Sequence, residues 1–146
     1  MNTIKLQRTT ENDWQLVSDI KEAAVSDIFH ANLGEVAIKK YLRDFESYFI
    51  THENKMVGII GYRPEPEING YYIGELIVSQ EYKGKGFGKA AMQIALELIG
   101  NHPVKLTTHP ENSPAICLYL KLGFKIKAWK DNYYNDGEPR IVMIKE

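Results

Sequence analysis

Residues 76–90 read LIVSQEYKGKGFGKA, and this is the most informative stretch of the sequence. An apolar strand leads through a short turn into a loop with glycine at every second position, and the loop runs into a helix-forming segment. Alternating glycines leave backbone N–H groups uncovered, so an anion can approach them closely. The start of a helix adds partial positive charge there, and Lys83, Lys85 and Lys89 flank it. The stretch therefore predicts a cradle for a phosphate or pyrophosphate.

Two common phosphate-binding loops do not fit this spacing. A P-loop needs Gly-x-x-x-x-Gly-Lys and then Ser or Thr, but Ala90 follows Lys89 here and Lys83 stands in the first glycine position. The dinucleotide fingerprint Gly-x-Gly-x-x-Gly fails because Lys89 replaces its third glycine. A dinucleotide-binding domain would also need several such strand–loop–helix units, and the chain has one.

A second informative segment, residues 112–124, reads NSPAICLYLKLGF. Asn112 is a suitable helix cap, Pro114 suits the first turn, and Gly123 suits a left-handed stop after the last turn. Ala115 and Tyr119 are four residues apart, which places them on one face of the predicted helix.

Together the two segments resemble the GNAT acyl-CoA N-acyltransferases. The family's pyrophosphate loop, Gln/Arg-x-x-Gly-x-Gly/Ala, is matched except that Lys83 stands first, and Asn-x-x-Ala-x-x-x-Tyr-x-x-x-Gly-Phe is matched at each position. The resemblance covers the C-terminal half well and the N-terminal half in outline. It implies an α+β fold, with a mixed, mostly antiparallel sheet flanked by about four helices, and a single domain over residues 1–146.

The family resemblance also implies acetyl-CoA as the cofactor and assigns roles to residues. In the family, the tyrosine hydroxyl of the second segment points at the thioester sulfur, so Tyr119 is expected to protonate the departing thiolate; a thiol pKa near 8.5 and a phenol pKa near 10 suit that transfer. A backbone N–H, most simply that of Val78, is expected to bind the developing oxyanion. The residues expected to bind the cofactor are Ile77, Val78, Lys83, Gly84, Lys85, Gly86, Phe87, Gly88, Lys89, Asn112, Ala115 and Tyr119.

The amine acceptor places a further demand on the site. An amine with a pKa near 10.4 is almost wholly protonated at neutral pH, so a base or a chain of waters leading to a base is needed. Glu75, on the strand before the loop, is the expected base or relay, with a solvated surface carboxylate as the alternative. Tyr133 and Tyr134 resemble a segment that borders the acceptor site in amine-acetylating relatives, and a cap over the core is the alternative.

Composition indicates an ordinary globular protein. Of the 146 residues, 44% are apolar and 25% charged, and the net charge of −1 gives no reason to expect a nucleic-acid partner. No apolar run is long enough for a transmembrane helix, and residues 1–8 lack a signal-peptide core, so a cytoplasmic protein is expected. The one cysteine, Cys117, is expected to be a core thiol. The four histidines lack metal-ligand spacing, and no metal is expected.

Periodicity along the chain predicts the order strand, two helices, three strands, helix, strand, helix, two strands. The first helical stripe runs from Trp14 to Ile28, and the second from Val36 to Phe45. The last two strands form a hairpin whose loop contains Tyr133 and Tyr134. A homodimer through exposed C-terminal strands is possible.

The expected function is transfer of an acetyl group from acetyl-CoA to a primary amine of a small molecule or peptide, directly in a ternary complex. The alternative is a non-catalytic module of the same fold that senses acyl-CoA. A broken glycine loop or a missing Tyr119 would favour the sensor, and both features are intact.

Overall fold

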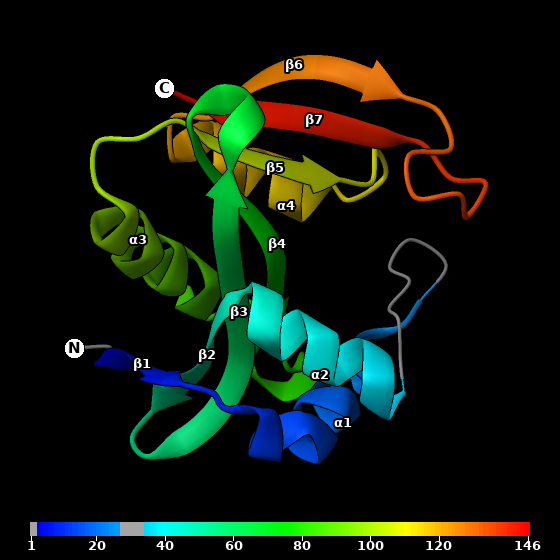
Figure 1. Ribbon diagram of the computed structural model, residues 1–146. Helices are drawn as coiled ribbons and strands as arrows, with labels where there is room; N and C mark the ends of the chain where they lie inside the picture. The colour runs from blue at the N-terminus through cyan, green and yellow to red at the C-terminus, as the bar shows by residue number, and fades with distance from the viewer. Residues whose placement is uncertain (1–2, 27–33) are drawn as a thin grey trace.

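The computed structural model describes residues 3–26 and 34–146, and within these ranges the chain forms one seven-stranded sheet and four α-helices (Figure 1). The element order is the predicted one. The strands are β1 (Ile4–Arg8), β2 (Glu46–His52), β3 (Lys55–Glu65), β4 (Gly70–Val78), β5 (Val104–Thr108), β6 (Lys125–Lys130) and β7 (Arg140–Lys145). The helices are α1 (Trp14–Ala24), α2 (Glu35–Asp44), α3 (Phe87–Ile99) and α4 (Ser113–Lys121).

The strands lie in the order β1-β2-β3-β4-β5-β7-β6. Each neighbouring pair is antiparallel except β4 and β5, which are parallel, so the predicted mixed and mostly antiparallel sheet is confirmed. A search of the described residues finds no helix with the length and apolarity needed to cross a membrane.

Two apolar clusters cover the two faces of the sheet. Because side chains alternate along a strand, Phe49 and Ile59 pack under α1 and α2, whereas their neighbours Ile50 and Ile60 belong to the cluster that contains the buried face of α3. Figure 1 shows α1 and α2 side by side and α3 apart from them. The helices therefore enclose the sheet from both sides.

The first helix is shorter than its sequence pattern suggested. It ends at Ala24, because Val25 has an extended backbone with φ −61° and ψ 134°. The expected helical stripe is therefore interrupted at Val25, and its last member, Ile28, lies outside the described residues.

A bulge in β4 decides which side chains reach the functional face. Gly61 pairs with Glu75 while the next residue, Tyr62, pairs with Ile73, so Gly74 is an extra residue in the strand. One extra residue reverses the in–out alternation, and as a result Tyr72, before the bulge, and Glu75, after it, both face the side of α1 and α2.

Gly74 also has a steric reason to be glycine. The ring of Phe45 packs directly on its backbone, and a Cβ added at Gly74 would lie 2.5 Å from Phe45 Cε2.

The parallel strands β4 and β5 pair only at their beginnings. Tyr71 and Tyr72 pair with Val104 and Lys105, and beyond them the described residues show no further β4–β5 pairing. The second half of β4 is therefore free of a neighbour on that edge, and this separation makes room for the site.

Candidate active site

The three glycines of the glycine loop, residues 83–89, differ in backbone conformation. Gly84 and Gly86 have φ of +79° and +83°, in the left-handed region that side chains disfavour. Gly88 lies inside α3, and a Cβ there would make an ordinary contact, 3.6 Å from Val78 Cγ2. Two of the glycines are thus needed for the turn, whereas the third position has space for a methyl group.

The loop presents the start of α3 to solvent. The first helical hydrogen bond runs from the N–H of Ala90 to the carbonyl of Gly86 at 3.1 Å, so the N–H groups of Phe87, Gly88 and Lys89 precede the helical ladder. The Phe87 side chain is buried, and the centre of its ring lies 4.8 Å from the centre of the His52 ring. Only the backbone of Phe87 can therefore contact a ligand here. This geometry suits a pyrophosphate.

The backbone of β4 offers one donor toward the gap between the strands. The N–H of Ser79 donates to the carbonyl of Val57 on β3 at 2.8 Å. Because successive N–H groups of a strand point to opposite edges, the N–H of Val78 points away from β3, toward the side from which β5 has separated. This placement supports Val78 as the expected oxyanion donor.

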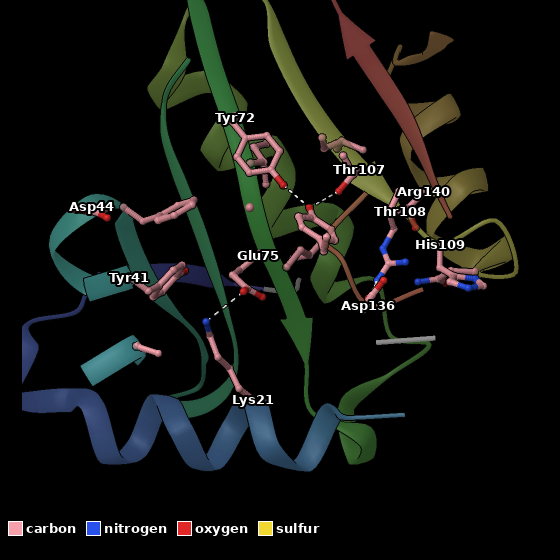
Figure 2. Close-up of a pocket in the computed structure, with 18 of the residues that line it drawn as sticks. Lys21, Tyr41, Asp44, Tyr72, Glu75, Thr107, Thr108, His109, Asp136 and Arg140 are labelled. Carbon is pink, nitrogen blue, oxygen red and sulfur yellow. Dashed lines mark hydrogen bonds and ion pairs between the residues drawn. The ribbon is translucent and has the colours of Figure 1, made fainter. Parts of the chain in front are cut away.

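A pocket of about 570 Å³ opens where β4 and β5 separate. Figure 2 shows residues from α1, β4 and the C-terminal strands meeting around it. Four predicted site residues line this pocket, namely Glu75, Asn112, Tyr119 and Tyr134. The other residues along it are Lys21, Ala37, Lys40, Tyr41, Asp44, Phe45, Tyr72, Ile73, Gly74, Leu76, Leu106, Thr107, Thr108, His109, Asp136 and Arg140. The other predicted site residues are not part of the lining, namely Ile77, Val78, the glycine loop, Ala115 and Tyr133.

Tyr119 is placed by the capped helix that the sequence predicted. The side chain of Asn112 accepts a hydrogen bond from the N–H of Ala115 at 3.3 Å, and Gly123 follows the helix with φ +96°. Tyr119 is 8% exposed, and burial raises the pKa of its hydroxyl to about 12. No described residue hydrogen-bonds this hydroxyl, which is protonated and available to donate into the pocket.

Glu75 is not the solvated carboxylate that the sequence left as an alternative. Its Oε1 accepts a hydrogen bond from Lys21 Nζ at 3.1 Å, and its side chain is 17% exposed. Burial raises the pKa of this carboxyl, while the charge of Lys21 opposes the rise. Lys21 Nζ in turn lies 3.8 Å from the centre of the Tyr41 ring. Figure 2 shows Lys21 reaching from α1 to Glu75 on β4.

The two tyrosines of the C-terminal hairpin have different surroundings. The Tyr134 hydroxyl lies 2.6 Å from both the Tyr72 hydroxyl and Thr107 Oγ1, so it bridges β4 and β5 where they begin to separate. Tyr133 packs edge-on against Tyr134, with ring centres 4.7 Å apart. Tyr134 is therefore a pocket wall, whereas Tyr133 stands behind it.

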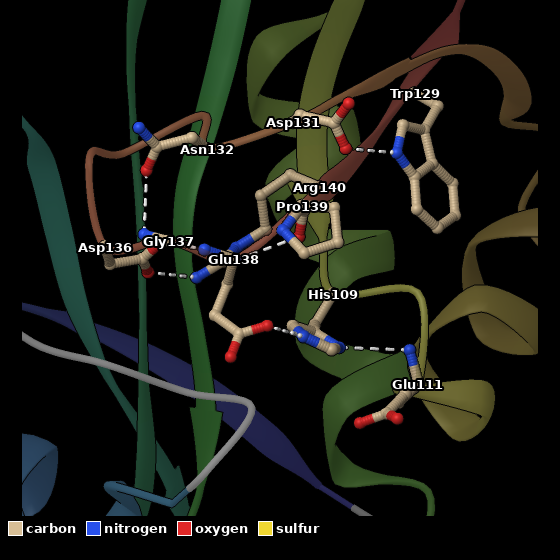
Figure 3. Close-up of polar contacts among 10 residues, drawn as sticks. All are labelled: His109, Glu111, Trp129, Asp131, Asn132, Asp136, Gly137, Glu138, Pro139 and Arg140. Atoms are coloured by element: carbon tan, nitrogen blue, oxygen red, sulfur yellow. Dashed lines mark hydrogen bonds and ion pairs between the residues drawn. The ribbon is translucent and has the colours of Figure 1, made fainter.

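Polar contacts hold the hairpin loop that carries these tyrosines (Figure 3). Asp136 Oδ2 pairs with Arg140 at 2.8 Å, and Asn132 Oδ1 accepts the N–H of Gly137 at 2.7 Å. His109, at the end of β5, accepts the N–H of Glu111 on Nδ1, which leaves Nε2 to face the Glu138 carboxylate at 3.1 Å. The hairpin loop is thus held against the segment that leads into the N-terminal end of α4, the helix that carries Tyr119.

Sequence patterns did not identify several of the residues that line the pocket. Lys21 carried a usable signal, because it lies four residues after Val17 and three before Ala24, inside the apolar stripe of α1. Tyr41 read simply as part of an apolar helix face, and no local pattern marked Thr107 or Arg140.

Comparison with known proteins adds independent observations. Residues 14–124 match the model of the family described as "Acetyltransferase (GNAT) family". An N-alpha-acetyltransferase of Sulfurisphaera tokodaii is 30% identical over 120 residues, which cover 71% of this chain and 72% of that protein.

Two solved structures share the fold. Arabidopsis thaliana Naa50, in complex with the bisubstrate analogue CoA-Ac-MVNAL, superposes with a TM-score of 0.79 at 21% identity, covering 98% of each chain. A chimera of spermidine N-acetyltransferase SpeG from Vibrio cholerae and hSSAT gives 0.80 at 15% identity, covering 97% of this chain and 94% of that one. These findings confirm the family, enzyme class and cofactor expected from the sequence: the chain belongs to the GNAT acetyltransferase family and is an acetyl-CoA-dependent N-acetyltransferase.

Proposed function

We propose that this protein transfers the acetyl group of acetyl-CoA directly to the α-amine of a peptide. The observation that carries the proposal is the meeting of Glu75 and Tyr119 in one pocket at the β4–β5 separation. A largely buried carboxylate whose pKa is raised suits a proton acceptor, and a phenol that stays protonated at neutral pH is in the form that a proton donor requires.

Each of these groups has a distinct role in the proposed reaction. The glycine loop and the start of α3 bind the pyrophosphate, and Lys83 and Lys89 add positive charge. Acetyl-CoA supplies an activated thioester. Glu75 takes a proton from the acceptor's ammonium group, directly or through water, and the neutral amine then attacks the thioester carbonyl. The N–H of Val78 stabilises the oxyanion, and Tyr119 gives a proton to the leaving thiolate.

Two observations favour a peptide α-amine over other amines. The relative from Sulfurisphaera tokodaii is named an N-alpha-acetyltransferase. In addition, among the described residues each carboxylate that lines the pocket has a cationic partner: Glu75 pairs with Lys21, Asp44 with Lys40 and Asp136 with Arg140. A polyamine needs unpaired carboxylates for its additional charges, whereas a peptide α-amine brings one charge to this part of the site.

The direct test is release of free CoA thiol with a panel of acceptors. The panel pairs a peptide bearing a free N-terminus with the same peptide blocked at the N-terminus and carrying one lysine, and adds spermidine and an aminoglycoside. We expect turnover with the free N-terminus and a mass increase of one acetyl group on its α-amine. Tight acetyl-CoA binding without thiol release on any acceptor would instead favour the sensor module.

A further inference from the structure

The ammonium group of Lys21 lies between two partners that both stabilise a cation. Its Nζ lies 3.1 Å from Glu75 Oε1 and 3.8 Å from the centre of the Tyr41 ring. A carboxylate on one side and an aromatic face on the other are the two partners that stabilise a desolvated ammonium. The Lys21 side chain is 5% exposed, so the arrangement is buried within the pocket wall.

A tethered lysine competes strongly with a free ligand. Its ammonium is held beside Glu75 by the α1 backbone, which gives it a high effective concentration at that point. Displacing it would leave a buried charge without a partner. The second oxygen of Glu75 accepts no hydrogen bond from the described residues, so it can still serve the reacting amine.

We propose that Glu75 and Tyr41 form an ammonium subsite that Lys21 fills, and that Lys21 thereby restricts the enzyme to acceptors with one positive charge near the reacting amine. The inference deepens the function proposed above and rests on it for its consequence in turnover. The subsite itself is a binding property that can be tested without turnover.

The first arm measures ammonium binding by thermal unfolding. Lys21→Ala removes the charge and opens the subsite, whereas Lys21→Met removes the charge but fills the space. We expect n-butylammonium chloride, compared with sodium chloride at equal concentration, to raise the unfolding midpoint of Lys21→Ala and to leave wild type and Lys21→Met unchanged. Adding Glu75→Gln to Lys21→Ala should abolish the rise. An equal response in Lys21→Ala and Lys21→Met would overturn the proposal.

The second arm measures selectivity. The matched acceptors are two peptides with free N-termini that differ only at the second residue, norleucine in one and lysine in the other. We expect Lys21→Ala to raise the ratio of kcat/KM for the lysine peptide over the norleucine peptide by about tenfold relative to wild type, the factor that corresponds to one charged hydrogen bond. Lys21→Gln keeps length and polarity and should move the ratio in the same direction if Lys21→Ala folds poorly. An unchanged ratio in both variants would contradict the restriction.

The two arms separate the inference from the wider function. If no acceptor is acetylated by wild type, the proposed function fails, and the thermal arm still decides whether the subsite exists. If peptides are acetylated but ammonium does not stabilise Lys21→Ala, the function holds and the subsite is wrong.

Discussion

The proposed acceptor pocket lies beside β4 and the glycine loop follows the end of that strand, yet the two regions are built in different ways. The loop comes from consecutive residues, and the groups proposed to bind the cofactor are backbone N–H groups positioned by Gly84 and Gly86. The pocket comes from residues far apart in the chain: Lys21 meets Glu75 across 54 positions, and Tyr72 meets Tyr134 across 62. A site made of backbone groups can therefore be predicted from consecutive residues, whereas a site made of side chains depends on contacts between residues that only the fold brings together.

The largest expected effect comes from Tyr119, which lines the pocket. Tyr119→Phe should lower kcat by about a hundredfold to ten-thousandfold, the usual contribution of a general acid, and leave acetyl-CoA binding intact. Thiol-release kinetics and calorimetric titration of acetyl-CoA check both parts. A kcat within tenfold of wild type would remove Tyr119 from the proton transfer.

The raised pKa of Tyr119 has its own consequence for pH dependence. Because burial raises this pKa to about 12, the hydroxyl keeps its proton throughout the neutral and mildly basic range. The kcat profile should therefore show no loss from Tyr119 below about pH 10. A basic limb near neutral pH that disappears in Tyr119→Phe would contradict the assignment.

The next effect concerns Glu75 in the acceptor pocket. The base must be ionised, and burial raises the pKa of this carboxyl above its ordinary 4.5, so kcat/KM should rise with pH along a limb above that value. Glu75→Gln should lower kcat/KM by about a hundredfold and abolish the limb. The control is Asp44→Asn, a carboxylate at the pocket rim whose loss should leave the limb in place. If the acidic limb remains in Glu75→Gln, it reports the titration of another group, and Glu75 is not the base.

A smaller effect distinguishes the glycines of the loop. Gly86→Ala forces a methyl group onto a backbone with φ +83°, at a cost of about 1–2 kcal/mol, and should weaken acetyl-CoA binding by about tenfold. Gly88→Ala, inside α3, is the matched control and should bind nearly as wild type does. Equal losses in the two variants would show that backbone conformation is not what the glycines supply.

The smallest expected effect tests the pocket wall. Tyr134→Phe loses the hydroxyl that bridges Tyr72 and Thr107, and should raise the acceptor KM by about fivefold, corresponding to roughly 1 kcal/mol for a hydrogen bond. The KM for acetyl-CoA should not change. Tyr133→Phe serves as the control, since its ring stands behind Tyr134. A change in the acetyl-CoA KM alone would place Tyr134 on the cofactor side.

The difference between the two regions explains how far the sequence could be interpreted. The strand–loop–helix at residues 76–90 and the capped helix before Gly123 each follow from local rules, and the element order followed from periodicity. Gly74 inside a strand pattern is compatible with a bulge, but only the pairing of β3 with β4 shows that the bulge turns Glu75 toward Lys21. The partners of Glu75 and Tyr134 depend on this long-range geometry.

One expectation from composition was wrong. Cys117 was expected to be a core thiol, but it is exposed. It lies two residues before Tyr119 on α4, a spacing that directs the two side chains to different sides of the helix. The buried face of α4 had been identified correctly by Ala115 and Tyr119, and the same periodicity places Cys117 away from it. The exposed thiol is therefore not part of the pocket.

The central claim is that the two regions act together, with cofactor and acceptor bound at once and the acetyl group passing directly between them. The most direct test is an initial-velocity study in which acetyl-CoA and an acceptor peptide are varied against each other. Direct transfer predicts double-reciprocal lines that intersect. Parallel lines, together with an acetylated enzyme intermediate detected by mass spectrometry, would contradict the account.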